Sequence, residues 1–513
     1  MNRWLDTRRV LIAMVGLGLF ALAARGVTDP DLWWHLRTGQ LILGNHAVFH
    51  ADPYSFTRLG QPWVNHEWLS DVFIFTLYRV FGWGGLIVTF SAITAAAFLL
   101  VFLRCPGRPA IAAVATTWAG VASIPLWGVR PQTLSLLLIS GFLLILDSPQ
   151  KDGSRNKDAA DDGSAERPNL LWWIPPLMLL WVNLHAGFAA GIGLVGLFLL
   201  GHVLDSAFGF EPWVQAAPRI RRLTSVLGVS LAVIPLNPNG SKMFWYPLAT
   251  LRSPAMQRHI AEWFSPDFHQ PQYWAALAMI LASLLAVALS PRRVLPRELL
   301  LLFTTMYMGL HSVRHLAIYV LVAAPILGGL ADAWVGNWAA VRRHDPPDRS
   351  EVAPASGKIR TGLNAVLLAS FLAFALARIH LVVGRQAETE AARFPAAAVA
   401  YLSTHRPPGP LFNYYDWGGY LIWKLYPGVP VYIDGRADLY GDAFMDSFAE
   451  TYNLTNHWEA PLEAWQIRTV IVPPSAPLAA ALASRAGWQQ IYSDPQAVIL
   501  TEGISTSGQS LRK

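Results

Sequence analysis

Two aspartates separated by a proline, Asp29-Pro30-Asp31, follow directly after the first apolar stretch of the chain. A carboxylate at the edge of an apolar segment is partly desolvated, which raises its pKa and suits it to act as a general base. His35 follows Asp31 by four residues and would share its helical face, where it could orient the carboxylate. Asp29 could instead cap a helix that starts at Pro30. The motif therefore predicts proton abstraction and leaves both aspartates as candidate bases.

Further polar side chains fall in the loops between later apolar stretches. His66 and Glu67 could contact a substrate or cap a second helix. Arg130 and Arg314 could hold a phosphate, because a guanidinium offers it paired donors. The remaining candidates fit either a substrate contact or a structural role: Asn183 with His185, His311 and His315 on one predicted helical face with Arg314, and Asp416, Asp434 and Arg436.

The many histidines and acids among these candidates leave a divalent metal ion open as an alternative. No spacing matches a dedicated ligand set, and His311 with His315 comes nearest to two histidines four apart on a helix. We therefore predict no certain cofactor and assign no residue as a metal ligand. Cys105 is the only cysteine, which excludes an intrachain disulfide.

Apolar helices must position these residues, because the composition is that of a polytopic membrane protein. Charged residues make up 14% of the 513 and hydrophobic residues 53%, whereas soluble chains average about 25% charged. The net charge of +6 is spread over short loops, so it does not indicate a nucleic-acid partner. Stretches suited to spanning a bilayer predict about eleven transmembrane helices, near residues 8–27, 83–103, 110–127, 131–147, 170–184, 187–206, 223–236, 274–290, 298–311, 315–333 and 362–383.

The distribution of lysine and arginine predicts the orientation of these helices. Both residues concentrate in the loops that are cytoplasmic if the N-terminus is inside, as positively charged loops generally are. An odd number of spans then places the C-terminus on the outer face. Eleven of the fourteen histidines fall on that face, so we expect the chemistry there. Two polar inner loops, Ser148–Asn169 and Arg342–Lys358, have too few apolar residues to bury a core and are predicted to be disordered.

Two regions differ from the apolar stretches. The first outer loop, residues 28–82, contains TDPDLWWHLRTGQLILGN and HEWLSDVFIFTLYRVFG, which predict two juxtamembrane helices lying in the interface. After Arg385 the hydropathy falls, and strand-like LFNYY, PVYIDGR, TVIVPP, QQIYSD and AVILTE alternate with helix-like segments, which indicates a small α/β domain. We predict a transmembrane domain over residues 1–385, whose first outer loop is catalytic, and an extracytoplasmic α/β domain over residues 386–513.

These features together resemble the GT-C superfamily of polyprenyl-phosphate-dependent glycosyltransferases. The resemblance covers most of the chain: an acidic pair after the first span, two juxtamembrane helices, many further spans and an external C-terminal domain. More narrowly, a group of bacterial integral-membrane proteins of this superfamily is similar in DPDLWWHLRTG, DPYSFTRLGQPWVNHEWLSD, WVNLHAGF, YDWGGYLIW and DGRADLYG.

The resemblance implies an activity and a location. It implies inverting transfer of a sugar from a polyprenyl-phosphate donor to a glycan, lipid or protein acceptor. The reaction would take place at the outer face of the bacterial cytoplasmic membrane. Asp29 or Asp31 would be the base, and Arg130 and Arg314 with His315 would lie near the donor phosphate.

Three alternatives to this interpretation remain. An O-antigen ligase or polymerase usually places its working residues in a large late outer loop, whereas here the acids come first. A transporter or lipid flippase would show polar residues at the bilayer midplane and inverted repeats, which we do not find in the sequence. A non-catalytic assembly factor that keeps the fold is the third alternative.

Overall fold

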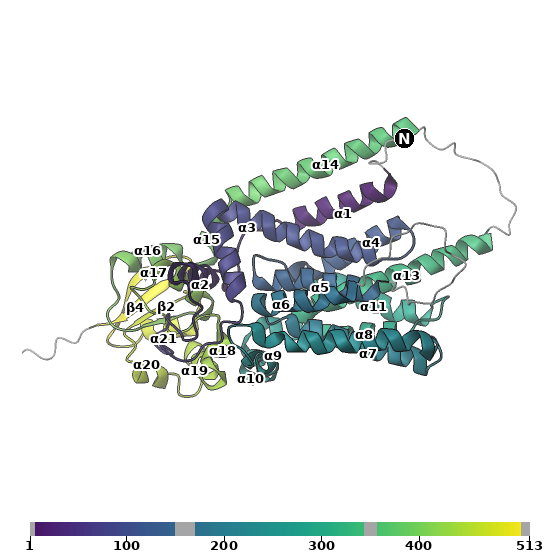
Figure 1. The fold of residues 1–513 in the computed structure, drawn as a ribbon. Coiled ribbons are helices and arrows are strands. Elements are labelled where there is room, and N and C mark those ends of the chain that lie inside the picture. Colours follow the sequence, from purple (N-terminus) through teal and green to yellow (C-terminus); the bar gives the residue numbers. More distant parts are fainter. Residues whose placement is uncertain (1–5, 149–169, 343–356, 504–513) are drawn as a thin grey trace, which may run out of the picture. The chain divides into compact units, whose positions relative to one another are not determined.

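The computed structural model describes residues 6–148, 170–342 and 357–503 (Figure 1). The predicted disordered loops Ser148–Asn169 and Arg342–Lys358 fall almost entirely outside these residues. The first fourteen helices are α1 Thr7–Ala23, α2 Leu32–Asn45, α3 Trp68–Arg104, α4 Pro109–Ser123, α5 Pro131–Asp147, α6 Ile174–Leu184, α7 Phe188–Ala207, α8 Trp213–Ala232, α9 Lys242–Arg252, α10 Pro254–His259, α11 Trp274–Ala288, α12 Pro296–His311, α13 Leu316–Arg342 and α14 Gly357–Gly384.

Each of the eleven predicted apolar stretches coincides with helix, namely α1, the second part of α3, α4 to α8 and α11 to α14. Six helical stretches among the described residues are long and apolar enough to cross a membrane: residues 68–104, 109–126, 188–207, 271–288, 313–339 and 359–384. The chain is therefore a multi-pass membrane protein, while the count of eleven spans stays a prediction.

The described chain packs into two compact units. One unit comprises residues up to 25, 88–244 and 262–381, and is helical. In it α13 packs against α4, α11 and α12, and α7 packs against α12. Helix α7 also lies alongside α8 (Figure 1). The most apolar part of α13 is 72% buried, whereas that of α14 is 11% buried. An apolar helix so exposed needs a hydrocarbon environment, which a bilayer supplies.

The second unit comprises residues 26–87, 245–261 and those from 382 onward. Its sheet has the order β1-β2-β4-β3, with β1 and β2 parallel and the other pairs antiparallel. The small C-terminal α/β domain is thereby confirmed, and its boundary at residue 385 stays a prediction. The remaining elements are α15 Gln386–Arg393, α16 Ala396–Thr404, β1 Leu411–Asn413, α17 Gly418–Leu425, α18 Ala437–Tyr440, α19 Asp442–Asn453, α20 Ala460–Ala464, β2 Thr469–Val472, α21 Pro477–Ala483, β3 Trp488–Ser493 and β4 Val498–Glu502.

The segment PVYIDGR was predicted as a strand, and this prediction is wrong. Val431 forms only an isolated bridge with Ser55. The side chain of Asn413 accepts the backbone N–H of Tyr432 at 2.9 Å and donates to the carbonyl of Ile433 at 2.8 Å. A side chain thus satisfies backbone groups that a neighbouring strand would otherwise take. The segment runs as irregular chain, which frees its last residues to enter the site described below.

The first of the two segments predicted to form juxtamembrane helices forms α2. The second forms the first part of α3, which bends at Gly82. Trp33 of α2 is fully buried and meets the rings of Tyr420 and Phe394 edge-on, with centroids 4.7 and 5.1 Å away. Aromatic pairs in this geometry add to the stabilisation from burial. This cluster fixes α2 against α17 and so sets where Asp31 and His35 lie.

Candidate active site

The acidic pair lies at the entry to α2, and its two carboxylates have different partners. Asp29 Oδ1 accepts the backbone N–H of Asp31 at 2.9 Å, so Asp29 shapes the turn into the helix. Asp31 makes no capping bond, and its Oδ1 accepts the indole N–H of Trp34 at 3.1 Å. The helix begins at Leu32, two residues later than predicted. The Asp31 carboxylate therefore takes no part in capping.

The Asp31 carboxylate packs against the backbone of Gly435. A Cβ atom added at residue 435 would lie 1.6 Å from Asp31 Oδ1, so only glycine permits this approach. Burial and the negative charge of Asp29 raise the pKa of Asp31 to about 7, against the opposing effects of His35 and Trp34. A carboxyl group that titrates near neutral pH is well matched to general-base catalysis.

His35 is buried between two acids of the α3 entry. Its Nδ1 lies 2.6 Å from Asp71 Oδ1, and its Nε2 lies 3.6 Å from Glu67 Oε2. Burial opposes a charged imidazole, but the hydrogen bond to Asp71 and the charges of Asp71 and Glu67 raise the pKa of His35 to about 9. His35 is therefore protonated at neutral pH and presents positive charge to Asp31.

The close packing of α2 on α3 brings His35 to these acids. A Cβ atom at Gly39, one turn beyond His35, would lie 2.1 Å from the carbonyl oxygen of Asp71. The backbone N–H of Asp71 donates to the carbonyl of Glu67 at 2.9 Å, so the two acids follow one another by a helical turn and share a face. Asp71 was not among the predicted site residues, although its i+4 spacing from Glu67 was a signal in the sequence.

A chain of polar contacts continues from Glu67. His66 Nε2 lies 3.5 Å from Glu67 Oε1, and the rings of His66 and Tyr246 have centroids 4.3 Å apart. The Tyr246 hydroxyl hydrogen-bonds to Asp438, and burial raises the pKa of that aspartate. The side chains of His35, Glu67, His66, Tyr246 and Asp438 thus form one connected polar cluster.

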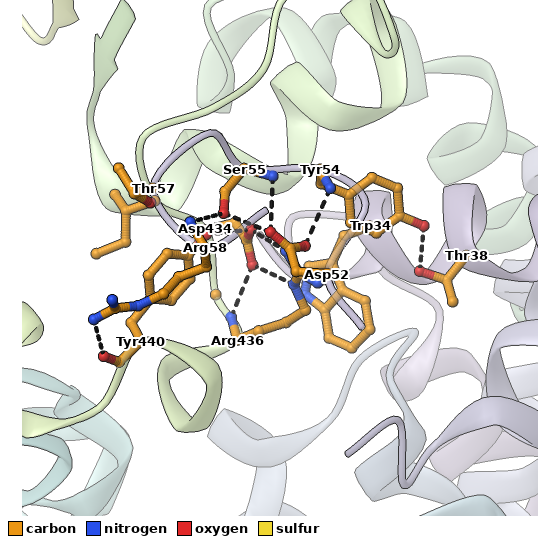
Figure 2. Close-up of polar contacts among 12 residues, drawn as sticks. Trp34, Thr38, Asp52, Tyr54, Ser55, Thr57, Arg58, Asp434, Arg436 and Tyr440 are labelled. Atoms are coloured by element: carbon orange, nitrogen blue, oxygen red, sulfur yellow. Dashed lines mark hydrogen bonds and ion pairs between the residues drawn. The ribbon is translucent and has the colours of Figure 1, made fainter. Parts of the chain in front are cut away.

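Asp434 and Arg436 form a buried ion-pair cluster with Asp52 (Figure 2). Arg436 donates from Nε and Nη2 to the two carboxylate oxygens of Asp434 at 2.7 and 2.6 Å, and Nη2 lies 2.8 Å from Asp52 Oδ1. The Tyr440 hydroxyl also donates to Asp434, at 2.7 Å. The Arg436 residue is 2% exposed. This geometry favours a structural role for the pair, which flanks and holds the peptide of Gly435.

The YDW motif lies beside the acidic pair. Asp416 accepts the hydroxyl of Tyr414 at 3.2 Å; burial raises the pKa of Asp416, and the charge of Asp29 adds to that effect. The hydroxyl of Tyr415 donates to the carbonyl oxygen of Gly435 at 3.2 Å. Asp416 is therefore part of the surroundings of the predicted base.

In the helical unit, cationic residues gather around Glu262. Arg130 Nη2 lies 2.5 Å from Glu262 Oε1, and the guanidinium of Arg314 stacks over Trp263 with its carbon 4.4 Å from the ring centroid. Burial opposes ionisation of Glu262, but Arg130, Arg314 and His185 together lower its pKa. One carboxylate thus faces three cationic or polar groups, each from a different loop.

His311, Arg314 and His315 do not share one continuous helical face, so that prediction is wrong. Helix α12 ends at His311, Ser312 is extended, and a short 3-10 turn covers residues 313–315. The Ser312 hydroxyl donates to the carbonyl of Glu262 at 2.9 Å, and the Val313 N–H donates to that of Phe264. These long-range hydrogen bonds end the helix and place Arg314 against Trp263.

Asn183 and His185 have structural partners at the turn after α6. Asn183 donates to the carbonyl of Leu179 at 2.8 Å. His185 Nδ1 accepts the backbone N–H of Gly187 at 2.8 Å and lies 2.8 Å from the hydroxyl of Ser135. Because Nδ1 accepts, the ring proton of a neutral His185 sits on Nε2. A substrate role for this pair stays a prediction.

Among the described residues, one group has ligand atoms close enough together for a metal ion: His202, Asp205 and Glu211. Arg297 Nη1 lies 2.9 Å from His202 Nε2, and the Arg297 backbone N–H donates to Asp205 at 2.9 Å. A guanidinium already supplies the positive charge there. We therefore assign no metal to this cluster, and it contains none of the predicted site residues.

No protein-family model and no curated protein sequence matches the chain. Solved structures do. ArnT from Cupriavidus metallidurans bound to undecaprenyl phosphate is 15% identical, with a TM-score of 0.51 over 98% of this chain and 99% of that one. The Archaeoglobus fulgidus oligosaccharyltransferase AglB, in complex with an inhibitory peptide and a dolichol-phosphate, is 12% identical, with a TM-score of 0.55 over 99% and 75%.

The chain has the GT-C fold. The resemblance noted in the sequence is thereby confirmed at the level of fold, which is what identities of 12–15% establish. Roles of individual residues in a GT-C reaction stay predictions.

Within this GT-C fold the predicted residues fall into two groups. The second unit brings together Asp29, Asp31, His35, His66, Glu67, Asp416, Asp434 and Arg436, and the helical unit contains Arg130, Asn183, His185, His311, Arg314 and His315. Sequence reasoning did not place Asp71 or Tyr246 in the site. Tyr246 carries no local signal, because only folding brings its helix to Asp438.

Proposed function

We propose that the chain is an inverting glycosyltransferase, which moves a sugar from a polyprenyl-phosphate donor to an acceptor at the outer face of the bacterial cytoplasmic membrane. The GT-C fold supports a donor of this class, since ArnT and AglB were solved with undecaprenyl phosphate and dolichol-phosphate. The observation that carries the proposal is Asp31, a carboxyl group with a pKa of about 7 packed against Gly435 and facing a protonated His35.

The proposed reaction is a single displacement. The ionised carboxylate of Asp31 takes the proton from an acceptor hydroxyl or amine as the acceptor atom forms a bond to the anomeric carbon. The bond from that carbon to the phosphate oxygen breaks on the opposite side, and its electron pair leaves with the polyprenyl phosphate. Attack opposite the leaving group inverts the configuration. Because the phosphate leaves as a stable anion, it needs positive charge more than a proton donor.

Asp31 is a better base than Asp29 on this geometry. The carboxylate of Asp29 accepts the backbone N–H of residue 31, which favours a structural role for Asp29. Its negative charge also raises the pKa of Asp31. Asp29 therefore acts in the proposal as the group that tunes the base.

The helical unit offers the charge that the donor phosphate requires. Arg130 and Arg314 both lower the pKa of Glu262, so two guanidinium groups lie near the same acid, and guanidinium groups match phosphate oxygens in pairs. Arg436 is a weaker candidate, because its Nε and Nη2 are already bonded to Asp434 and Asp52. We assign the donor phosphate to Arg130 and Arg314.

The proposal is tested with the full chain in liposomes supplied with polyprenyl-phosphate sugars. Wild-type protein should release polyprenyl phosphate and transfer the sugar, and a variant with both Asp29→Asn and Asp31→Asn should do neither while keeping wild-type expression. Mass spectrometry of lipids that co-purify with the chain should detect a polyprenyl-phosphate sugar and name the donor. Undiminished transfer by the double variant would exclude these aspartates as the base. Co-purification of no such lipid, with no turnover of any donor offered, would point to an assembly factor.

A further inference from the structure

A cavity of about 330 Å³ adjoins the polar cluster at Tyr246 and Asp438. Three segments of the second unit wall it: residues 62–64, residues 246–256 of α9 and α10, and residues 437–442 at α18 and the start of α19. Small-molecule sites have volumes of about 300–1,000 Å³. The cavity therefore suits a compact ligand such as a sugar ring better than a long polyprenyl chain.

The polar groups that line the cavity are those that bind hydroxyls. Asp438 and Asp442 contribute carboxylates, and Thr250 and Ser253 contribute hydroxyls. Ser253 donates to Asp442 Oδ1 at 2.5 Å. A carboxylate has about four acceptor positions, so Asp442 and Asp438 can accept further hydrogen bonds from a ligand.

Apolar and aromatic surface completes the walls. Trp63, Tyr246 and Met256 line the cavity together with Leu439. Aromatic faces carry partial negative charge, which suits the C–H bonds on the face of a sugar ring. Convergent carboxylates and hydroxyls beside aromatic surface match a ring that presents hydroxyls at its edge and C–H groups on its face.

The charge of the cavity selects against a phosphate. Two carboxylates line it against a single guanidinium, that of Arg252, and Glu67 lies behind Tyr246, where its charge raises the pKa of the phenol. An anionic ligand would meet like charge here, so the donor phosphate is disfavoured. A neutral hydroxylated ligand meets no such penalty.

The cavity is electrostatically connected to the proposed base. Tyr415 lies within the field of both Asp31 and Asp438, whose negative charges, after burial, raise its pKa well above the usual value. The same phenol donates to the carbonyl of Gly435, whose backbone packs on Asp31. A ligand next to Asp438 is therefore in the neighbourhood of the group that would take its proton.

We propose that this cavity holds the acceptor, and that the acceptor presents a neutral polyhydroxylated ring, that is, a sugar of a glycan or glycolipid. The inference rests on the proposed function and names the substrate class that the proposed function leaves open. The charge of the cavity favours a neutral acceptor, since two carboxylates and a single guanidinium line it.

The test is a binding experiment on the full chain in lipid nanodiscs, with saturation-transfer NMR as the readout. The probes are the methyl glycosides of glucose, galactose, mannose and N-acetylglucosamine, with methyl glucuronide as the anionic counterpart. At least one neutral glycoside should receive saturation, and the glucuronide should receive at least about fivefold less. Equal saturation of the anionic probe, or none in any neutral probe, would overturn the proposal.

Substitutions at the α9 wall locate the binding. Ala249 lines the cavity and is exposed, so Ala249→Leu and Ala249→Phe should fill the space stepwise and reduce saturation progressively. Leu248→Phe is the matched control, because Leu248 is exposed on the same helix and does not line the cavity. Thermal unfolding should be unchanged in all three variants. Full binding by a folded Ala249→Phe variant would place the site elsewhere, and neither result depends on turnover of the donor.

Discussion

A buried carboxylate, Asp434, and a half-buried one, Asp31, lie on either side of one peptide, and their surroundings are opposite. Asp434 receives three hydrogen bonds from Arg436, two from the guanidinium and one from the backbone N–H, and a fourth from Tyr440. Asp31 receives one from the indole of Trp34, and it is pressed against Gly435 with the charge of Asp29 nearby. Asp434 is thus held in one orientation by its donors, whereas the pKa of Asp31 is raised to about 7, so its protonation can change near neutral pH.

The fixed carboxylate positions the reactive one. Asp52 lies in the first long loop, between α2 and α3, where it accepts the backbone N–H groups of residues 54 and 55, and it also binds Arg436. Arg436 thereby ties the first loop to the C-terminal segment on which Gly435 lies. The wall that buries Asp31 depends on this tie, so the two carboxylates should respond differently to the loss of charge.

The largest contrast is expected in activity. Asp31→Asn keeps the size of the side chain and its bond with Trp34, but it removes the base. General-base catalysis contributes about 10²–10⁴-fold, so transfer should fall by that factor while thermal unfolding is unchanged. The measurement is sugar transfer from the polyprenyl-phosphate donor per folded protein. Loss of less than about tenfold would assign the proton to another group, with Asp29 the first to examine.

The converse contrast is expected in stability. Arg436→Met leaves Asp434 and Asp52 buried without their cation, and such a loss costs about 3–5 kcal/mol. Arg58→Met is the matched control, because Arg58 donates to a backbone carbonyl, that of Tyr440, and stacks on Phe444. The midpoint temperature of thermal unfolding in detergent should fall much further for Arg436→Met than for Arg58→Met. Equal decreases in unfolding temperature for the two substitutions would mean that the ion-pair cluster of Asp52, Asp434 and Arg436 does not stabilise the fold.

Local patterns predicted the helices well, because each one depends on nearby residues. Every long apolar stretch forms helix, and Trp33 and His35 fall on α2 as the motif indicated. The break at Ser312 could not be predicted, since it arises from hydrogen bonds to residues 262 and 264. The same holds for PVYIDGR, whose backbone partners include the side chain of Asn413.

The candidate site shows the same limit. The sequence indicated which residue types gather on one face, and Asp31, His35 and Glu67 do lie together. It did not indicate which charges compensate one another. Arg436 fitted a substrate contact as well as a structural role until its partners Asp434 and Asp52 were known. Pairing of charges is a tertiary property, and it decides between a structural and a chemical role.

The pH dependence of transfer should report the reactive carboxylate directly. The base must be ionised, so activity is present above the pKa of Asp31 and is lost as the pH falls through about 7. Below that value kcat/KM should fall about tenfold per pH unit. Measurement of transfer from pH 5 to 8.5 tests this. A profile flat down to pH 5 would mean that the base titrates like an ordinary carboxylate.

The smallest expected effect is a shift of the acidic limb of this pH profile, and it distinguishes the role of Asp29 from that of Asp31. The charge of Asp29 raises the pKa of Asp31, so Asp29→Asn should move the acidic limb to lower pH and retain transfer at pH 8. His35 has the opposite influence, because its positive charge lowers that pKa. His35→Gln should therefore move the limb to higher pH. Shifts of opposite sign in the two variants require a base whose pKa is raised by Asp29 and lowered by His35, as that of Asp31 is. If both variants kept the wild-type limb, the group that titrates would be remote from α2.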